Sequence, residues 1–299
     1  MKVLLAVSGG IDSMYMAEKA PDLFPGASFA IAHCNFCLRG AESDGDEAFV
    51  REYASGKGLD CYVKRFDTTS YAEAGGLSIE MAARDLRYAW FDELCSAEGF
   101  DAVAVAHNAD DNAETFLLNL VRGTGTRGLR GMGNRGKIVR PLLGISRAEI
   151  HSYMLSKGLS WREDSSNASP AHKRNRLRSE VIPVLKELNP SLLASLRGTM
   201  EHIREVDDLA SDYYETVKPG LLTEEGLISI RALLALKHAR YVLFRLVEHV
   251  ALSQTALDNL WDVVSSGRQV GGRVFKGKRG SVLGRPKWRL EIKLIDKTC

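Results

Sequence analysis

Short apolar segments rich in β-branched residues alternate with helical patterns through the first 122 residues of the chain. Strands and helices are expected in turn over residues 2–7, 13–20, 29–33, 42–57, 59–64, 78–98, 102–106 and 110–122. Strands that alternate with helices form a parallel sheet, because each helical crossover packs back against the sheet. We therefore expect an α/β fold with a Rossmann-like parallel sheet and helices on both of its faces.

The strand patterns stop after Pro141, and the remainder of the chain has a mainly helical pattern. Helical patterns cover residues 146–157, 177–188, 192–217, 230–250 and 254–265. Asn189 and Pro190 predict a break between two domains. Six glycines separate short apolar segments near the C-terminus and indicate a basic hairpin or an extended tail. We expect an α/β domain over residues 1–189 and a smaller, mainly helical domain over residues 190–299.

The composition narrows the class of protein. Hydrophobic residues make up 45% of the 299 residues and charged residues 26%, which excludes a disordered chain and predicts a packed core. No apolar stretch approaches the ~20 residues that span a bilayer, and no secretory leader pattern follows Met1, so we expect a cytoplasmic protein without membrane partners. Five cysteines suit reduced thiols; Cys34 and Cys37 have metal-ligand spacing, but ordinary thiols are favoured because a second such pair is missing.

Positive charge is concentrated in two windows although the net charge is only +2. Between Glu114 and Glu149 there are seven basic residues and no acidic one, and between Asp262 and Glu291 there are eight and none. Solvated loops are one reading of such windows. Contact with a polyanion explains two glycine-rich basic windows better, and the first of them includes Arg122, Arg127 and Arg130.

A glycine loop follows the first expected strand and opens a helix; it consists of Ser8, Gly9, Gly10, Ile11, Asp12 and Ser13. Two glycines allow a tight turn that brings consecutive N–H groups to a ligand, and the helix behind them adds the positive end of its dipole. The loop lacks the lysine of a Walker A motif and the spacing of a dinucleotide fingerprint. A turn capped by Asp12 or Ser13 without a ligand is the alternative, but the end of the first parallel strand favours an anion site.

A second cluster follows the fourth expected strand. Asp111 and Glu114 lie three residues apart, share one helix face, and could hold Mg²⁺ together with phosphate oxygens. Acidic residues favoured by a helix N-terminus are the alternative, which explains Asp110 but not His107 or the location. We favour a functional cluster. The role of His107 stays open: it stacks on a base, takes part in acid–base steps, or is a partly buried histidine without a site role.

A third cluster spans residues 80–88, where Arg84 and Arg87 lie one helical turn apart. An arginine at a phosphoryl-transfer site stabilises charge that develops on the α-phosphate. A surface helix with a Glu80–Arg84 pair explains the same residues equally well.

The glycine loop SGGIDS resembles the SGG-x-DS signature of the PP-loop, or N-type ATP pyrophosphatase, superfamily. In that superfamily the loop grips the pyrophosphate of ATP, which implies activation of a substrate oxygen by adenylation. Longer strings, above all AHNADDNAETFLLNLVRGTGTRGLRGM at residues 106–132 but also WREDSSN at residues 161–167, resemble the tRNA(Ile)-lysidine synthetase family over most of the first 190 residues. Many members carry a second histidine after His33, and this chain does not, so any role of that histidine does not transfer.

This narrower resemblance implies ATP-dependent attachment of L-lysine to C2 of the wobble cytidine in the isoleucine tRNA with a CAU anticodon, releasing AMP and pyrophosphate. Mg²⁺ is the implied cofactor. Matching family positions imply catalytic or metal-binding roles for Asp12, Arg87, Asp111 and Glu114, to which we add His107 as a candidate. The positions expected to bind tRNA are Arg122, Arg127, Arg130, Arg174, Asn175 and Arg178.

Several alternatives remain open at this stage. Asp12, Asp111 and Glu114 are all candidates for the base that deprotonates the lysine amine. A related tRNA thiolase would activate a base identically but deliver sulfur, and it would need cysteines beyond Cys34 and Cys37. A tRNA-binding nucleotide sensor without catalysis is a third possibility. Some relatives also carry a further C-terminal domain.

Overall fold

The computed structural model describes residues 1–163, 173–267 and 270–294 of the chain. It divides into two compact units, Met1–Arg204 and Glu205–Cys299. The sequence places the domain boundary at residue 189, whereas this division falls inside helix α10 (Leu192–Val217). The first half of α10 belongs with the first unit because Arg204 donates to the carbonyl oxygens of Arg130 (2.9 Å) and Met132 (3.3 Å).

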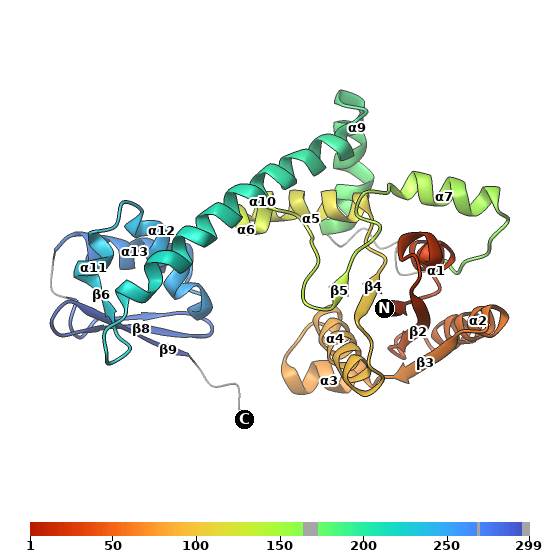
Figure 1. Cartoon of the computed structure of the whole chain (residues 1–299), viewed down its shortest axis with the longest axis horizontal. Coiled ribbons are helices and arrows are strands. Elements are labelled where there is room, and N and C mark those ends of the chain that lie inside the picture. Colours follow the sequence, from red (N-terminus) through yellow and green to blue (C-terminus); the bar gives the residue numbers. More distant parts are fainter. Residues whose placement is uncertain (164–172, 268–269, 295–299) are drawn as a thin grey trace. The chain divides into compact units, whose positions relative to one another are not determined.

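The first unit is built on a five-stranded sheet in the order β3-β2-β1-β4-β5, with every neighbouring pair parallel (Figure 1). The strands are β1 (Lys2–Ala6), β2 (Ser28–Asn35), β3 (Asp60–Arg65), β4 (Ala102–Val105) and β5 (Ile138–Val139). The parallel sheet and four of its strands confirm the expectation from the sequence. The two-residue β5 is too short to produce a hydrophobic pattern of its own.

Helices cover both faces of this sheet, as expected (Figure 1). On one face α1 (Ile11–Leu23), α2 (Ala41–Lys57) and α7 (Arg147–Ser156) share a core with Val3 and Leu5 of β1. On the other face α4 (Ile79–Ala97) packs against Leu4, and α3 (Thr68–Gly75) contacts α4. Successive residues of a strand point to opposite faces, so a strand buried on both sides is apolar throughout.

The strand order creates a switch point between β1 and β4. From β1 the chain moves outward through β2 and β3, and it then returns to the other side of β1 with β4 and β5. The carboxyl ends of β1 and β4 therefore lie side by side, followed by the glycine loop and by α5 (Ala109–Arg122). Open α/β sheets bind ligands at such a point, because the two connections diverge and leave a crevice between them.

The first unit is completed by short helices around α5. These are α6 (Thr126–Leu129), α8 (Lys173–Arg176), a π-helical segment (Leu177–Val181) and α9 (Ile182–Leu188). Helical structure expected over 177–188 is present, with Pro183 in the first turn of α9, where its missing N–H is tolerated. None of the helices in the described ranges combines the length and apolarity needed to cross a bilayer.

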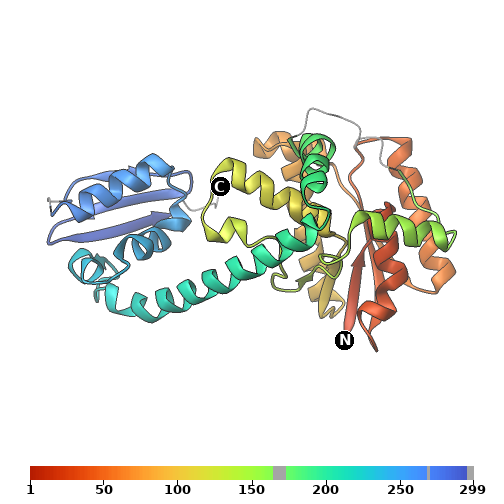
Figure 2. The same ribbon diagram turned by 90° about the horizontal axis from the view of Figure 1, so that it is seen from above.

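The second unit combines helices with an antiparallel sheet in the order β6-β9-β8-β7 (Figure 2, blue). The helices are α11 (Ile230–Leu234), α12 (Ala239–Val247) and α13 (Gln254–Ser265). The strands are β6 (Ile228–Ser229), β7 (Val274–Lys276), β8 (Gly280–Arg285) and β9 (Arg289–Leu294). The expected hairpin is therefore present.

One helix prediction is wrong. A single helix was expected over residues 230–250, but the chain turns between Leu234 and Ala239 and forms two helices. Apolar residues continue through the turn, so the hydrophobic spacing does not reveal it. The turn brings Leu233 and Leu243 into the same buried core as Val282 of the sheet.

Candidate active site

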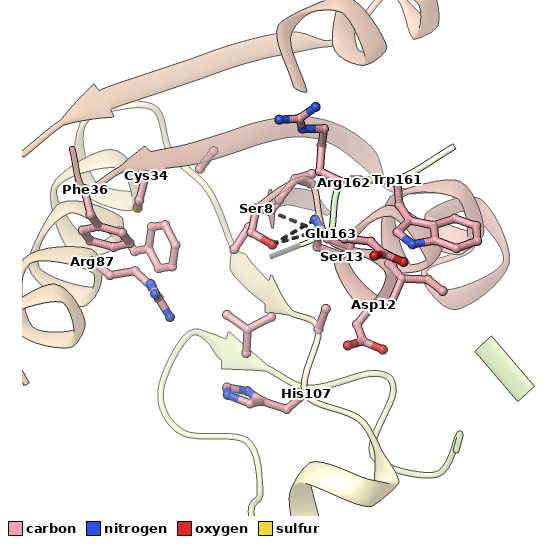
Figure 3. Close-up of a pocket in the computed structure, with 18 of the residues that line it drawn as sticks. Ser8, Asp12, Ser13, Cys34, Phe36, Arg87, His107, Trp161, Arg162 and Glu163 are labelled. Atoms are coloured by element: carbon pink, nitrogen blue, oxygen red, sulfur yellow. Dashed lines mark hydrogen bonds between the residues drawn. The ribbon is translucent and has the colours of Figure 1, made fainter. Parts of the chain in front are cut away.

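The glycine loop turns at Gly9 and leads directly into α1. Gly9 has φ +94°, a left-handed conformation that residues with a Cβ avoid. Gly10 is the N-cap of α1 and makes no side-chain capping bond, so the first amides of this helix are not satisfied by a cap. Ser13 Oγ instead accepts from Ser8 N at 3.1 Å and lies 2.8 Å from the carbonyl oxygen of Gly10, to which it donates (Figure 3). Ser8 Oγ also accepts from Gly10 N at 3.3 Å, so the serines engage the amides of Ser8 and Gly10, and the amides available to a ligand are those of the first turn of α1.

A cavity of about 600 Å³ opens beside the glycine loop at the switch point (Figure 3). Its volume lies within the range of small-molecule sites, ~300–1,000 Å³. Lining residues come from the loop, the ends of β2 and β4, α4, α7 and the segment after α7; they include Ser8, Gly10, Ile11, Asp12, Ser13, Phe36, Arg87, His107, Arg147, His151, Trp161, Arg162 and Glu163. The sequence interpretation assigned no site role to the last five of these residues.

Asn108 connects the two dense clusters. Its Nδ2 donates to Asp12 Oδ1 at 3.0 Å, while its Oδ1 accepts from Asp111 N at 2.9 Å and caps α5. Burial raises the pKa of Asp12, and the Asn108 hydrogen bond and the Arg147 charge oppose that rise. Sequence reasoning missed Asn108, although an Asn followed three residues later by an acid is the pattern of a capping box.

Asp111 and Glu114 share a helix face as expected, and Arg178 lies against both. Arg178 Nε is 2.6 Å from Glu114 Oε1, and its Nη2 is 3.4 Å from Asp111 Oδ1. The Glu114 side chain is only 1% exposed. Burial raises the pKa of Glu114, and the Arg178 guanidinium works against this. The sequence associates Arg178 with tRNA, whereas the structure places it at the two carboxylates, 64 residues along the chain from Glu114.

Asp110 holds neighbouring elements in place. Its Oδ2 accepts from the backbone N–H of Arg147 at 2.8 Å, and its Oδ1 pairs with Lys186 Nζ at 2.9 Å. It thus joins the starts of α5 and α7 to α9, which supports a structural role for this residue.

His107 and Arg87 both line the cavity. Nδ1 of His107 is buried without a hydrogen-bond partner, and burial lowers the pKa of the ring to about 4. The Arg87 guanidinium lies over the Phe36 ring, and the Arg84 guanidinium lies over the Tyr88 ring. Arg87 therefore faces the site, and His107 is neutral near pH 7.

The depressed pKa of His107 predicts acid destabilisation. Between its ordinary pKa of 6.5 and about 4, the unfolded chain takes up a proton that the folded chain does not. We expect the free energy of unfolding to fall by roughly 2–3 kcal/mol as the pH decreases through this window. His107→Gln removes that contribution, so the difference in unfolding free energy between the two proteins, from denaturant unfolding, should change by this amount between pH 6.5 and about 4. A constant difference would contradict the buried, neutral state.

Cys34 and Cys37 differ in their surroundings. Burial raises the pKa of Cys34 to about 12, so this thiol stays protonated at neutral pH and is a poor metal ligand. Cys37 is exposed. Across the described ranges, no cluster of three or more His, Cys, Asp or Glu side chains is arranged to hold a metal ion.

The residues expected at the tRNA interface lie on several elements. Arg122 is exposed at the end of α5, and Arg127 and Arg130 belong to α6 and its C-cap. Arg174 is exposed and donates to Thr115 on α5 at 3.3 Å, while the backbone carbonyl of Asn175 accepts from Ser179. Residues 164–167 of the WREDSSN string lie outside the described residues.

Comparison with known proteins identifies the family. Residues 1–185 match the model described as the PP-loop domain. The tRNA(Ile)-lysidine synthase of Chlorobaculum tepidum is 43% identical over 239 residues, which cover 76% of this chain and 71% of that protein. The chain belongs to the PP-loop family, among the tRNA(Ile)-lysidine synthases. The matched range includes the glycine loop, residues 8–13.

Other relatives are longer than this chain. The tRNA(Ile)-lysidine synthases of Parabacteroides distasonis and Bacteroides thetaiotaomicron are 40% and 38% identical, and the matched segments cover 87% and 94% of this chain but 59% and 65% of theirs. Among solved structures, the U34-tRNA thiolase NcsA from Methanococcus maripaludis matches with a TM-score of 0.58, covering 69% of this chain and 72% of that one. Its 20% identity shows the PP-loop fold alone.

Proposed function

We propose that the chain attaches L-lysine to C2 of the wobble cytidine of the CAU-anticodon isoleucine tRNA, consuming ATP and releasing AMP and pyrophosphate. One observation carries this proposal. Asp12 of the glycine loop lines the cavity and accepts a hydrogen bond from Asn108, which caps the helix that carries Asp111 and Glu114, in a chain that belongs to the tRNA(Ile)-lysidine synthases.

The first step in this proposal is adenylation of cytidine. The O2 oxygen attacks the α-phosphorus, the bond from that phosphorus to the bridging oxygen breaks, and pyrophosphate leaves. The unsatisfied amides at the start of α1 suit the developing charge on pyrophosphate. Arg87, which lines the same cavity, suits charge on the α-phosphate.

The second step is attack by lysine. The ε-amine forms a bond to C2, the C2–O2 bond breaks, and AMP departs with its oxygen, because adenylation has made O2 a good leaving group. The amine has to be neutral to attack. Of the three candidate bases, Asp12 lines the cavity, and its raised pKa makes it a better proton acceptor than an ordinary aspartate.

The carboxylates of Asp111 and Glu114 are ligands of the type that Mg²⁺ prefers, since this ion binds one or two carboxylates together with phosphate oxygens. Asp111 and Glu114 would hold it, and the ion would neutralise charge on the triphosphate. Arg178 now pairs with both carboxylates and competes for them.

The tRNA partner is proposed from the base chemistry and the two basic windows. The cytosine has to leave the anticodon stack to reach the cavity, which suits recognition of an unstacked single-stranded base. Positive side chains around Arg127 and Arg130 would hold the flanking phosphates.

Charge reversal tests this interface. Arg127→Glu with Arg130→Glu is expected to weaken tRNA binding at least ten-fold and to reduce the slope of log K against log salt, because each lost phosphate contact lowers counterion release. Filter binding across ~50–200 mM salt gives both quantities. Unchanged affinity and slope would remove this window from the interface.

Pyrophosphate release with the cognate tRNA, with and without lysine, tests the whole proposal. Release together with incorporation of labelled lysine into the tRNA supports it. A nucleotide-sensing binder would release no pyrophosphate, and a thiolase would leave the lysine free.

A further inference from the structure

A segment that follows α7 forms a backbone hydrogen bond with the glycine loop. We call Trp161–Glu163 the strap. The backbone N–H of Arg162 donates to the carbonyl oxygen of Gly9 at 2.9 Å, and all three strap residues line the cavity (Figure 3). The Arg162 Cγ lies 3.6 Å from where a Cβ on Gly9 would be, so its stem packs directly on the loop.

Asp46 on α2 forms an ion pair with Arg162 of the strap. Its Oδ1 accepts from Arg162 Nε at 2.9 Å, and its Oδ2 accepts from Arg39 Nη2 at 2.7 Å. The Asp46 side chain is 11% exposed, so this carboxylate is little screened by solvent. Gly45 leaves room for the guanidinium, because a Cβ there would lie 3.0 Å from Arg162 Nη2.

These contacts restrict the conformations of the glycine loop. Gly9 has positive φ, and a two-glycine turn has many accessible conformations. The strap amide fixes the Gly9 peptide, and the ion pair limits the rotamers of the arginine that carries this amide. Preorganised amides bind an anion better because less conformational entropy is lost on binding.

We propose that Asp46 is a positioning residue for ATP. By pairing with Arg162, it keeps the strap on the Gly9 carbonyl and the loop amides aimed at the pyrophosphate. The inference rests on the proposed function only in that the glycine loop binds the triphosphate. Neither Asp46 nor Arg39 is expected to touch the nucleotide.

Calorimetric binding of α,β-methylene-ATP with Mg²⁺ to the full chain tests the inference. Asp46→Asn and Arg162→Met each break the link at one end while keeping the Arg162 backbone N–H. Each is expected to raise the Kd about ten-fold. For Asp46→Asn, whose side chain lies outside the cavity lining, kcat at saturating ATP is expected within about three-fold of wild type, because the change lies in preorganisation of binding. The double variant is expected to bind no more weakly than either single variant, since both disrupt one interaction.

Asp44→Asn is the matched control. Asp44 lies on the same helix and also pairs with an arginine, Arg65 at 3.0 Å, but away from the strap. Its Kd should equal that of wild type. Melting temperatures report folding separately, and Arg162→Met keeps the test valid if Asp46→Asn fails to fold.

Two results would overturn the inference: folded variants with wild-type Kd, or single-variant effects that multiply in the double variant. The Kd measurement needs neither tRNA nor lysine, which only the kcat comparison requires. A wild-type chain that binds the analogue but releases no pyrophosphate with tRNA and lysine therefore refutes the proposed function and leaves the role of Asp46 standing.

Discussion

Replacing Asp12 by alanine is expected to lower kcat for pyrophosphate release about 10³-fold, the usual scale for losing a positioned acid–base group. Asp12 lines the cavity at the start of α1 and accepts from Asn108, so its carboxylate is both placed and partly buried. The measurement is pyrophosphate release with ATP, lysine and the CAU-anticodon tRNA. Asp12→Asn should lose almost as much, because it preserves size but removes the charge.

A matched control lies at the far end of the same helix. Asp22 is largely exposed and pairs with Lys19, so Asp22→Asn should leave turnover unchanged. Full turnover by a folded Asp12→Ala protein would refute the catalytic role assigned to this residue and with it the present view of the site.

Glu114→Gln is expected to reduce both stability and turnover. The substitution replaces a charged hydrogen bond to Arg178 at a 1% exposed position, which should cost about 2 kcal/mol of unfolding free energy. We expect kcat to fall about 100-fold as well, because the cluster next to Asp12 loses a charge and its arginine loses its partner. Urea unfolding and pyrophosphate release measure the two effects.

A double-mutant cycle tests whether these losses of stability and turnover arise from the Glu114–Arg178 pair. Arg178→Met should show a similar loss, and the double variant should be less impaired than the sum of the single effects, since each single change leaves one charge without its partner. If the losses simply add, Glu114 and Arg178 act independently. Thr115→Ser, a conservative change in α5, is the folding control.

Much of the first unit could be predicted because its information is local. The alternation of strand and helix patterns identifies the parallel sheet, and a parallel sheet brings its strand ends to one edge. The glycine loop after β1 and His107 after β4 were therefore placed at the same edge, and the structure finds both at one cavity. Three-residue spacing likewise predicted that Asp111 and Glu114 share a face.

Prediction from the sequence fails where a feature depends on contacts between residues far apart in the chain or on a turn that the hydrophobic spacing does not show. Residues 230–250 keep an apolar spacing through a turn, so one helix was expected where there are two. Arg178 reads as part of a basic segment, because its charge is visible in the sequence but its partner is not.

The order of strands and helices, the open glycine loop and the common face of the two carboxylates were thus set by the sequence itself, since backbone propensity and side-chain periodicity act over a few residues. Only the tertiary structure decided that Asn108 meets Asp12, that Arg178 meets Glu114, and that Asp46 holds Arg162. These partners lie 96, 64 and 116 residues apart. Packing selects them from many chemically equivalent charges, and no local pattern records that choice.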